Sequence, residues 1–400
     1  MTQQHATAGV PPLRVAQIGY AFMGAAHSLA WRTAPRVFDL PRGAEMTVIC
    51  GRTASATEAA AHKLGWAEWS TDWRELVARD DIDIVDVCTP GDSHAEIAIA
   101  ALEAGKHVLC EKPLGNTVAE AEEMTAVAEA AAARGVRSMV GFNYRRLPAL
   151  SLARQMVADG RLGEVRHIRA KYQQDWIVDP AFPLAWRLQK DKAGSGALGD
   201  IGAHIIDLAQ FVTGQKLVGV SATTETFIKQ RPLPAASSGL AASGGQAAEM
   251  GEVTVDDAAV FFGRTEGGAL ATFEATRFAT GRKNGMGIEV NGSAGSFFFD
   301  FESMNELHVY DGTVPARDAG FRRILVTEPD HPYLSGWWPP GHVLGYEHTF
   351  THEVADFLSD IGSDRDPSPS FREGLQVQRV LDAVERSSAA ESRWTPIPTS

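Results

Sequence analysis

The first third of the chain alternates short apolar runs with helical stretches rich in Ala and Glu. The apolar runs are Leu13–Ile18, Met46–Cys50, Ile82–Cys88, His107–Cys110 and Ser138–Phe142. Between them lie helical patterns such as Ala54–Leu64, His94–Ala104 and Val118–Arg134. Strands that alternate with helices in this way form parallel sheets with right-handed crossovers. We therefore predict an α/β, doubly wound nucleotide-binding domain at residues 13–145.

After Arg145 the strand patterns follow one another directly, which predicts an α+β domain at residues 146–400 with a large, mostly antiparallel open sheet. The predicted strands are Val165–Asp175, Val218–Phe227, Asp257–Phe262, Ala269–Arg277, Gly287–Asn291 and Gly295–Phe299. The predicted helices are Pro148–Asp159, Ile201–Val212, His348–Ser359 and Phe371–Ala390. Met1–Pro12 is expected to be a disordered lead, and Pro232–Gly251, rich in Ala, Ser and Gly, a flexible surface excursion.

Composition limits the class of partner. The 400 residues carry a formal net charge of -13, which argues against nucleic acid and anionic lipid as main partners. No apolar run reaches the roughly 18 residues of a membrane span, and the polar N-terminus lacks the apolar core of a signal peptide. Cys50, Cys88 and Cys110 match no metal-binding spacing and are expected to be buried, reduced thiols. These features predict a cytoplasmic protein.

The first predicted strand runs into a glycine-rich turn of the kind that binds dinucleotides. The turn reads Gly19-Tyr20-Ala21-Phe22-Met23-Gly24, which is the G-x-G-x-x-G pattern with Ala21 at its middle glycine. The first glycine makes the tight turn, the last lets the helix pack against the strand, and the pyrophosphate lies on the helix N-terminus. The methyl group of Ala21 is expected to alter cofactor geometry without abolishing binding. A Gly-rich strand–helix turn without a ligand is the alternative.

The end of the second strand is where NAD and NADP are distinguished. An acidic residue there binds the ribose 2′-hydroxyl of NAD, whereas Arg with small polar neighbours favours a 2′-phosphate. This chain has Gly51-Arg52-Thr53 and no carboxylate at that place, which slightly favours NADP. Arg52 stacked on adenine would suit either cofactor, so NAD and NADP both remain open.

Two further stretches carry residues suited to oxidoreduction of an alcohol. Lys112, in Glu111-Lys112-Pro113, follows a strand at the edge where such sheets bind ligands, and its ammonium would stabilise charge on the reacting oxygen. Pro113 restricts the residue before it and is compatible with a cis bond. Asp200 and His204 are four residues apart at the start of a predicted helix, so they share a face, and His is suited to proton transfer. The alternatives are a surface lysine, a helix cap and a core histidine.

Together these residues resemble the glucose–fructose oxidoreductase / inositol dehydrogenase / MocA (Gfo/Idh/MocA) family. The matching pieces run in the family's order: Gly19–Gly24, Thr89-Pro90 with His94, Glu111-Lys112-Pro113, Phe142-Asn143-Tyr144-Arg145 and Gly196–Asp207. The resemblance implies a two-domain oxidoreductase with its active site between the domains, and a dimer or tetramer through the C-terminal sheet. It makes Lys112, Asp200 and His204 the catalytic group, with His204 as acid/base. It places the cofactor near Gly19–Gly24, Gly51, Arg52, Thr53, Thr89, Pro90, His94, Glu111, Lys112, Asn143 and Arg187.

The chain is more narrowly similar to a branch of that family that oxidises carbon 3 of glucosides and anhydrosugars. The similar stretches are Phe22-Met23-Gly24 with Ala26-His27-Ser28, Gln174-Asp175-Trp176, Trp186-Arg187 and Glu274-Ala275-Thr276-Arg277. That branch uses NAD, which opposes the inference from Arg52. The substrate-binding candidates, beside the catalytic group, are Tyr144, Tyr172, Gln174, Trp176 and Trp186, since Trp faces bind sugar C–H surfaces and Gln and Tyr bind hydroxyls. Core packing is the alternative for each. His331, Trp337, Trp338 and His342 are candidates for a roof over the pocket.

Three functions remain open at this stage. The first is a sugar or cyclitol dehydrogenase in which His204 takes the hydroxyl proton. The second is a regulator on the same scaffold that binds sugar and dinucleotide without turnover, and the third is a redox-neutral glycosidase that oxidises carbon 3 transiently. A zinc site is disfavoured: His348 and His352 have the right spacing, but Thr349 stands where a zinc protease has Glu.

Overall fold

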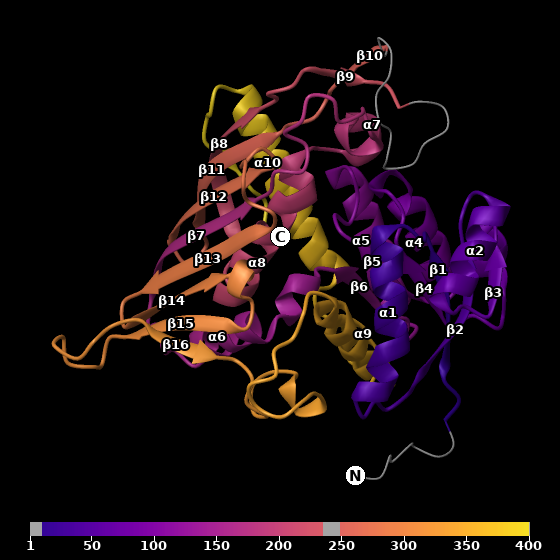
Figure 1. The fold of residues 1–400 in the computed structure, drawn as a ribbon, viewed down its shortest axis with the longest axis horizontal. Helices are drawn as coiled ribbons and strands as arrows, with labels where there is room; N and C mark the ends of the chain where they lie inside the picture. The colour runs from indigo at the N-terminus through magenta and orange to yellow at the C-terminus, as the bar shows by residue number, and fades with distance from the viewer. Residues whose placement is uncertain (1–9, 235–248, 400) are drawn as a thin grey trace. The chain divides into compact units, whose positions relative to one another are not determined.

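The computed structural model describes residues 10–234 and 249–399 and divides into two compact units (Figure 1). The first unit runs to Leu147 and also contains Thr327–Leu375. The second comprises Pro148–Val326 and continues from Gln376. Residues 1–9 of the predicted lead, and the middle of the predicted excursion, lie outside the described part of the chain.

The first unit is built on a six-stranded parallel sheet with the order β3-β2-β1-β4-β5-β6. Its strands are β1 (Leu13–Ile18), β2 (Ala44–Cys50), β3 (Glu68–Ser70), β4 (Ile84–Val87), β5 (His107–Glu111) and β6 (Ser138–Gly141). Every residue of β4 is buried, as is typical of a parallel sheet covered by helices on both faces. This order is the doubly wound dinucleotide-binding topology, so the predicted class of the first domain is confirmed.

Helices of the first unit connect and cover these strands. They are α1 (Phe22–Val37), α2 (Ala54–Leu64), α3 (Trp73–Ala78), α4 (His94–Glu103), α5 (Val118–Ala132) and α9 (Glu347–Gly362). α5 begins with a capping box, in which Thr117 accepts from the backbone of Glu120 and the Glu120 side chain accepts from the backbone of Thr117. α9 belongs to this unit because its apolar face, which includes Phe350 and Phe357, packs into one core with Trp31 of α1.

The second unit is built on a nine-stranded sheet with the order β16-β15-β14-β13-β7-β12-β11-β8-β17. Its strands are β7 (Val165–Gln173), β8 (Leu217–Glu225), β11 (Ala258–Thr265), β12 (Leu270–Thr276), β13 (Gly285–Gly292), β14 (Gly295–Asp300), β15 (Glu306–Asp311), β16 (Arg322–Leu325) and β17 (Thr395–Pro396). All neighbours are antiparallel except β7 and β12, which are parallel. The prediction of a mostly antiparallel sheet is confirmed.

The two faces of this sheet differ. Along β11, buried Ala259 and Phe261 alternate with exposed Val260 and Phe262. Figure 1 shows α8 (Ala203–Thr213) and the later part of α10 (Phe371–Ala389) along one face. On that face Ala222 of β8 donates its backbone N–H to Ser387 of α10. The opposite face has no helix from this unit over it in the described residues, so it forms an open platform.

Four features of the structure differ from the sequence predictions. The helix after the Gly-rich stretch starts earlier, with a π-helical turn at Leu198–Gly202. Strands β15 and β16 were not predicted, because charged residues at both ends of β15 and at the start of β16 shorten their apolar pattern. The flanks of the predicted excursion pair as a hairpin of β9 (Gln230–Pro232) and β10 (Met250–Glu252). The division after Arg145 also omits Thr327–Leu375, which packs with the first unit through α9.

Candidate active site

The fingerprint turn has the geometry that a pyrophosphate requires. Gly19 has φ +101, and a Cβ there would lie 2.6 Å from the carbonyl oxygen of Cys88. A Cβ on Gly24 would lie 2.2 Å from the Gly19 oxygen, so both positions require glycine. The backbone N–H groups at the start of α1 meet no side-chain cap and no acidic residue of the first turn. Ala21 is exposed, so its methyl group is accommodated, and these features fit a dinucleotide at this helix end.

A polar network that sequence reasoning missed holds this turn in place. The amide of Gln17 is completely buried and donates to the carbonyl oxygens of Gly19 and Gly24, both at 2.9 Å. Ser28 donates to the other end of the Gln17 amide at 3.1 Å and accepts from Trp66 at 2.9 Å. A glutamine inside an otherwise apolar strand was the available signal, because such a group must have buried partners.

The remaining predicted cofactor contacts lie along the carboxyl edge of the parallel sheet. Gly51 follows β2 and touches the Tyr20 ring so closely that a Cβ would lie 1.9 Å from a ring carbon. Arg52 and Thr53 are exposed beside it. His94 lies between the carbonyl oxygens of Thr89 and Pro113, at 2.9 Å from each. It therefore links the Thr89-Pro90 turn to the loop that carries Lys112.

Two residues that were predicted to contact the cofactor are buried and bind other residues of the first unit. Asn143 donates to Thr349 at 2.8 Å. Glu111 is 4 % exposed, and its two oxygens bind His27 and the backbone N–H of Lys112. We therefore treat Glu111 as a group that supports the lysine loop. The peptide bond between Lys112 and Pro113 is cis, as the sequence allowed.

In the second unit the structure gathers most of the predicted substrate residues. The rings of Tyr172 and His204 lie 6.0 Å apart. Tyr172 and Gln174 both donate to Asn284, at 2.7 and 2.8 Å, and Trp176 donates to Gln174 at 3.0 Å. A single polar chain therefore runs along the end of β7, with His204 at one side of it.

Asp200 is joined to this cluster by Arg277, a residue that the sequence analysis did not assign to the site. The guanidinium is fully buried, lies 3.6 Å from the Asp200 carboxylate and 5.5 Å from the ring of Trp176. It also donates to the backbone oxygen of Asp256 at 3.2 Å. The carboxylate of Asp256 in turn binds the backbone N–H groups of Gly196 and Leu198, at 2.7 and 2.8 Å. These hydrogen bonds from Asp256 hold the Gly-rich loop before His204 in place.

Other predicted residues stand apart from these contacts. Arg187 stacks on its neighbour Trp186 at 4.3 Å, and Trp186 is 37 % exposed. Tyr144 is buried in the first unit against Tyr346, at 6.2 Å between ring centres. Among the roof candidates, His331 accepts from the backbone of Glu328, His342 is exposed, and Trp338 is 63 % exposed.

Trp337, the fourth roof candidate, packs inward, and so bears on the zinc alternative. It donates to His352 Nε2 at 2.7 Å, while His352 Nδ1 faces the carbonyl oxygen of Arg146 at 2.9 Å. Burial lowers the pKa of His352 to about 3. Both ring nitrogens of His352 therefore have partners, and the pair with His348 is explained by packing.

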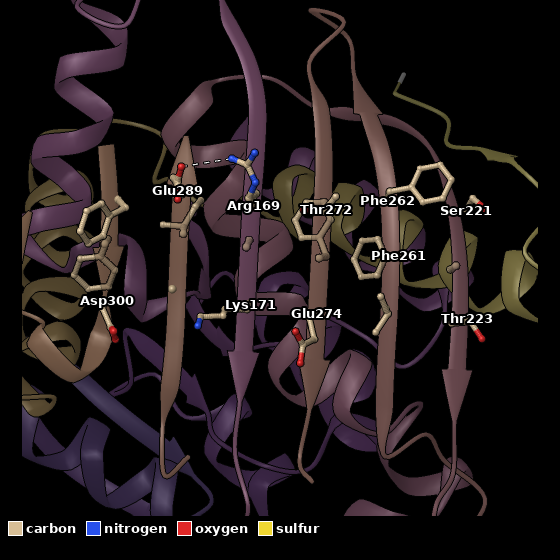
Figure 2. Close-up of a pocket in the computed structure, with 18 of the residues that line it drawn as sticks. Arg169, Lys171, Ser221, Thr223, Phe261, Phe262, Thr272, Glu274, Glu289 and Asp300 are labelled. Carbon is tan, nitrogen blue, oxygen red and sulfur yellow. Dashed lines mark hydrogen bonds and ion pairs between the residues drawn. The ribbon is translucent and has the colours of Figure 1, made fainter. Parts of the chain in front are cut away.

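A broad hollow lies elsewhere, on the open face of the nine-stranded sheet (Figure 2). Its volume is about 690 Å³, and its lining includes Arg169, Lys171, Phe262 and Glu274. The predicted catalytic and cofactor residues are not part of this lining. We give more weight to the polar cluster around His204 as the chemical site, because the hollow holds charged residues that pair with their strand neighbours, such as Arg169 with Glu289 at 3.5 Å.

A parallel dinucleotide-binding sheet with a fitting fingerprint, joined in one chain to a sheet that carries a His and Asp cluster, defines an NAD-binding oxidoreductase. Residues 13–142 match the oxidoreductase family model with an NAD-binding Rossmann fold. Residues 150–298 match the model of the GFO/IDH/MocA C-terminal domain. The chain belongs to the Gfo/Idh/MocA oxidoreductase family, and the resemblance seen in the sequence is confirmed.

Individual relatives narrow this further. Levoglucosan dehydrogenase of Pseudarthrobacter phenanthrenivorans is 42% identical over 391 residues, which cover 96% of this chain and 98% of the relative. A solved levoglucosan dehydrogenase in complex with NADH and levoglucosan is 40% identical, with a TM-score of 0.90 over 97% of this chain and all of that one, 100%. An oxidoreductase domain protein from Kribbella flavida, whose crystal structure is known, is 64% identical, with a TM-score of 0.93 over 97% and 100% of the two chains.

Within the described ranges, every helix is too short or too polar to traverse a lipid bilayer.

Proposed function

We propose that this oxidoreductase is an NAD-dependent dehydrogenase that oxidises the carbon-3 hydroxyl of levoglucosan or a related glucoside to a ketone. The observation that carries the proposal is the cluster of Asp200, His204 and Tyr172 beside Trp176 and Gln174. This cluster combines an acid/base group with an aromatic face and amide groups suited to a sugar ring. A relative that is 42% identical over nearly its whole length is named for levoglucosan, which supports the choice of substrate.

In this proposal each side chain acts on one hydroxyl group. His204 accepts the hydroxyl proton, since imidazole titrates near neutral pH. Asp200 orients His204 or the substrate, with Arg277 holding the Asp200 carboxylate in place. Lys112 donates a hydrogen bond to the same oxygen and stabilises the negative charge that develops there. NAD, when bound, supplies the carbon that accepts the hydride.

The dinucleotide would be held by the fingerprint turn, Gly19–Gly24, with its pyrophosphate on the exposed N-terminus of α1. Arg52 and Thr53 would lie near the adenosine ribose, and Thr89, Pro90, His94, Asn143 and Arg187 would shape the rest of the site, directly or by holding its loops. We propose NAD ahead of NADP, because the solved relative is named as a complex with NADH. Arg52 then contacts adenine.

The sugar would lie against Trp176, with Tyr172, Gln174 and Tyr144 near its hydroxyls. Trp176 is 37 % exposed, so part of its ring face is available to a ligand. Trp186 is equally exposed, but one face of its ring is already covered by the Arg187 guanidinium. We therefore expect Trp176→Ala to raise KM for the sugar more than Trp186→Ala does, which steady-state kinetics of the two variants would show.

A panel of levoglucosan, glucosides, inositols and polyols, assayed at 340 nm with NAD and with NADP, tests the activity. We expect NADH formation with at least one sugar or anhydrosugar. Release of free sugar without NADH would favour the redox-neutral glycosidase. Binding of NADH without any turnover would favour the regulator. Either result would reject the dehydrogenase.

The variant His204→Asn tests the acid/base assignment. We expect kcat to fall by about 10²–10⁴ while the dissociation constant of NADH changes little. His167→Asn, a half-buried histidine of β7 outside the cluster, is the matched control and should retain turnover. Normal turnover by His204→Asn would show that another group takes the proton.

We further propose that the open face of the nine-stranded sheet pairs with a second copy of the chain. Val260, Phe262 and Leu270 are 51 %, 47 % and 38 % exposed there. Figure 2 shows acidic and basic side chains side by side on this face, so a two-fold related copy offers complementary charges. Phe262→Glu should shift the mass measured by light scattering towards the monomer. An unchanged mass would reject this interface.

We place the enzyme in the cytoplasm. Its three cysteines are buried and free, which suits a reducing compartment.

A further inference from the structure

Four ionisable side chains are buried together in the first unit, behind the carboxyl ends of β4 and β5. They are His27 of α1, Asp86 of β4, Glu111 of β5 and Glu353 of α9, with exposed fractions of 1%, 0%, 4% and 0%. None of them belongs to the group that is proposed to act on the hydroxyl. Charged groups are costly to bury, so each such group needs a partner and the cluster needs a reason.

The imidazole of His27 joins two carboxylates. Its Nδ1 lies 3.0 and 3.1 Å from the two oxygens of Asp86, and its Nε2 lies 3.0 Å from an oxygen of Glu111. Trp31, one turn further along α1, donates to Asp86 at 2.7 Å. An ionised carboxylate accepts and does not donate, so with Asp86 and Glu111 in that form both ring nitrogens of His27 carry a hydrogen.

The electrostatic surroundings agree with a charged ring. Burial opposes the charge, but the carboxylate of Asp86 raises the pKa of His27 well above its ordinary value. Cys88, Cys110, Arg146 and Tyr346 are further titratable groups that face this cluster. His27, Asp86 and Cys88 also have the composition of a metal site. The two ring nitrogens point at carboxylates on opposite sides, which explains the cluster without an ion.

The chain of contacts ends at the lysine loop. One oxygen of Glu111 binds His27, and the other accepts the backbone N–H of Lys112 at 3.1 Å. Gly141, on the neighbouring strand β6, leaves room for this carboxylate, since a Cβ there would lie 3.1 Å from it. Glu111 is therefore held from both ends, by α1 and by the residue that follows it.

We propose that His27 is a positioning residue for Lys112: it ties the fingerprint helix α1 to Glu111 and thereby fixes the backbone from which Lys112 projects. The inference rests on the proposed role of Lys112. An ion cluster of this kind adds little stability compared with apolar residues of similar volume, and its use is the fixed geometry it imposes. The fingerprint turn is held separately, by Gln17, so His27 should affect turnover more than dinucleotide binding.

A double-mutant cycle tests this inference, with levoglucosan or the best sugar of the panel as substrate. We expect His27→Gln to lower kcat/KM by roughly 10- to 100-fold when Lys112 is present. In a Lys112→Met background, the same change should alter the residual kcat/KM by less than about threefold, because the group it positions is gone. The dissociation constant of NADH, measured by fluorescence, should change by less than about threefold in every variant.

The controls separate this role from general damage. His107→Gln alters a half-buried histidine at the opposite end of β5, whose Nδ1 accepts from the backbone of Arg137 at 2.9 Å. This variant should keep kcat/KM. The second variant is Asp86→Asn, which retains an acceptor for Trp31. It should lower kcat, as His27→Gln does, but by a smaller factor.

Distinct results would overturn distinct claims. Equal losses of kcat/KM from His27→Gln with and without Lys112 would show a general structural effect and reject the positioning role. Full activity of both His27→Gln and Asp86→Asn would reject it as well, and so would failure of both to fold. If Lys112→Met alone left turnover unchanged, the proposed function of Lys112 would fail, whatever His27 does.

Discussion

The two sheets of this protein treat charged side chains in opposite ways. In the six-stranded parallel sheet, Asp86 and Glu111 lie inside the protein and are paired with His27. In the nine-stranded sheet, the strand charges such as Arg169 and Glu289 stand on the open face, where water or a second chain can reach them. The difference arises because helices cover both faces of the parallel sheet and only one face of the other. A strand that is buried on both faces has no side on which an unpaired charge is tolerated.

The largest expected difference comes from removing one carboxylate on each sheet. Asp86→Leu leaves His27 Nδ1 and the Trp31 N–H, both buried, without a partner, and we expect it to lower the free energy of unfolding by about 3–5 kcal/mol. Glu289→Leu removes an exposed partner of Arg169 and should cost no more than about 1 kcal/mol. Urea unfolding of both variants measures this. Equal losses would break the comparison.

Arg277 tests whether burial of a charged side chain, or the type of sheet that carries it, decides how much stability its removal costs. Arg277 comes directly after β12, in the second unit, and its side chain is fully buried beside Asp200 and Asp256. If burial decides, Arg277→Met should lower the free energy of unfolding by about 3 kcal/mol, a loss similar to that of Asp86→Leu in the parallel sheet. Urea unfolding against Arg169→Met, on the open face, gives the measurement. A loss as small as that of Arg169→Met would contradict our explanation.

Glu353 sharpens the comparison through pH. Neither of its oxygens has a hydrogen-bond partner among residues 10–234 and 249–399, and burial raises its pKa from 4.5 to about 8. The folded state therefore holds this proton more tightly, and the stability it confers falls as the pH rises from about 4.5 to 8. Gln resembles the protonated acid. Between pH 5 and pH 8, Glu353→Gln should therefore gain on the order of 3–4 kcal/mol of stability over the wild type.

Unfolding curves of the two proteins at pH 5 and pH 8 measure this effect, and the background titrations cancel in the difference at each pH. A wild type that is the more stable protein at pH 8 would show that Glu353 is ionised and paired. In that case the buried cluster would need a different assignment of charges.

The smallest effect concerns an exposed charge in the first unit. Arg52 lies in the open at the end of β2, so a change there should leave stability nearly unaltered. Arg52→Asp should raise the preference for NAD over NADP, measured as the ratio of kcat/KM values, by about tenfold, which is about 1.4 kcal/mol. An unchanged ratio would show that Arg52 does not approach the ribose.

The sequence predicted most of what periodicity and glycine patterns encode. The parallel sheet, the fingerprint turn and the position of α8 followed from local signals, and so did the open sheet as a class. The placement of α9 could not be predicted, because its apolar stripe fits any core and its contact with α1 joins residues far apart in the sequence. Strands β15 and β16 pair with their neighbours along the chain, and they were missed because their own apolar patterns are short.

The candidate site was predicted in part. Tyr172, Gln174, Trp176 and His204 were singled out by residue type, and the structure brings them together. Arg277 and Asn284 were missed, since their roles depend on cross-sheet contacts to Asp200 and Tyr172. His27 and Asp86 carried a signal that was present but unused, a carboxylate within the apolar strand Ile84–Val87 and a histidine on the helix that covers it.

The reaction itself can be followed with an isotope. Levoglucosan that carries deuterium at carbon 3 would be incubated with NAD and the enzyme, and the nicotinamide product would be examined by mass spectrometry. Direct oxidation of carbon 3 predicts that the reduced cofactor contains the deuterium. Reduced cofactor without deuterium, or deuterium released to water while no reduced cofactor forms, would contradict the proposed oxidation of that carbon.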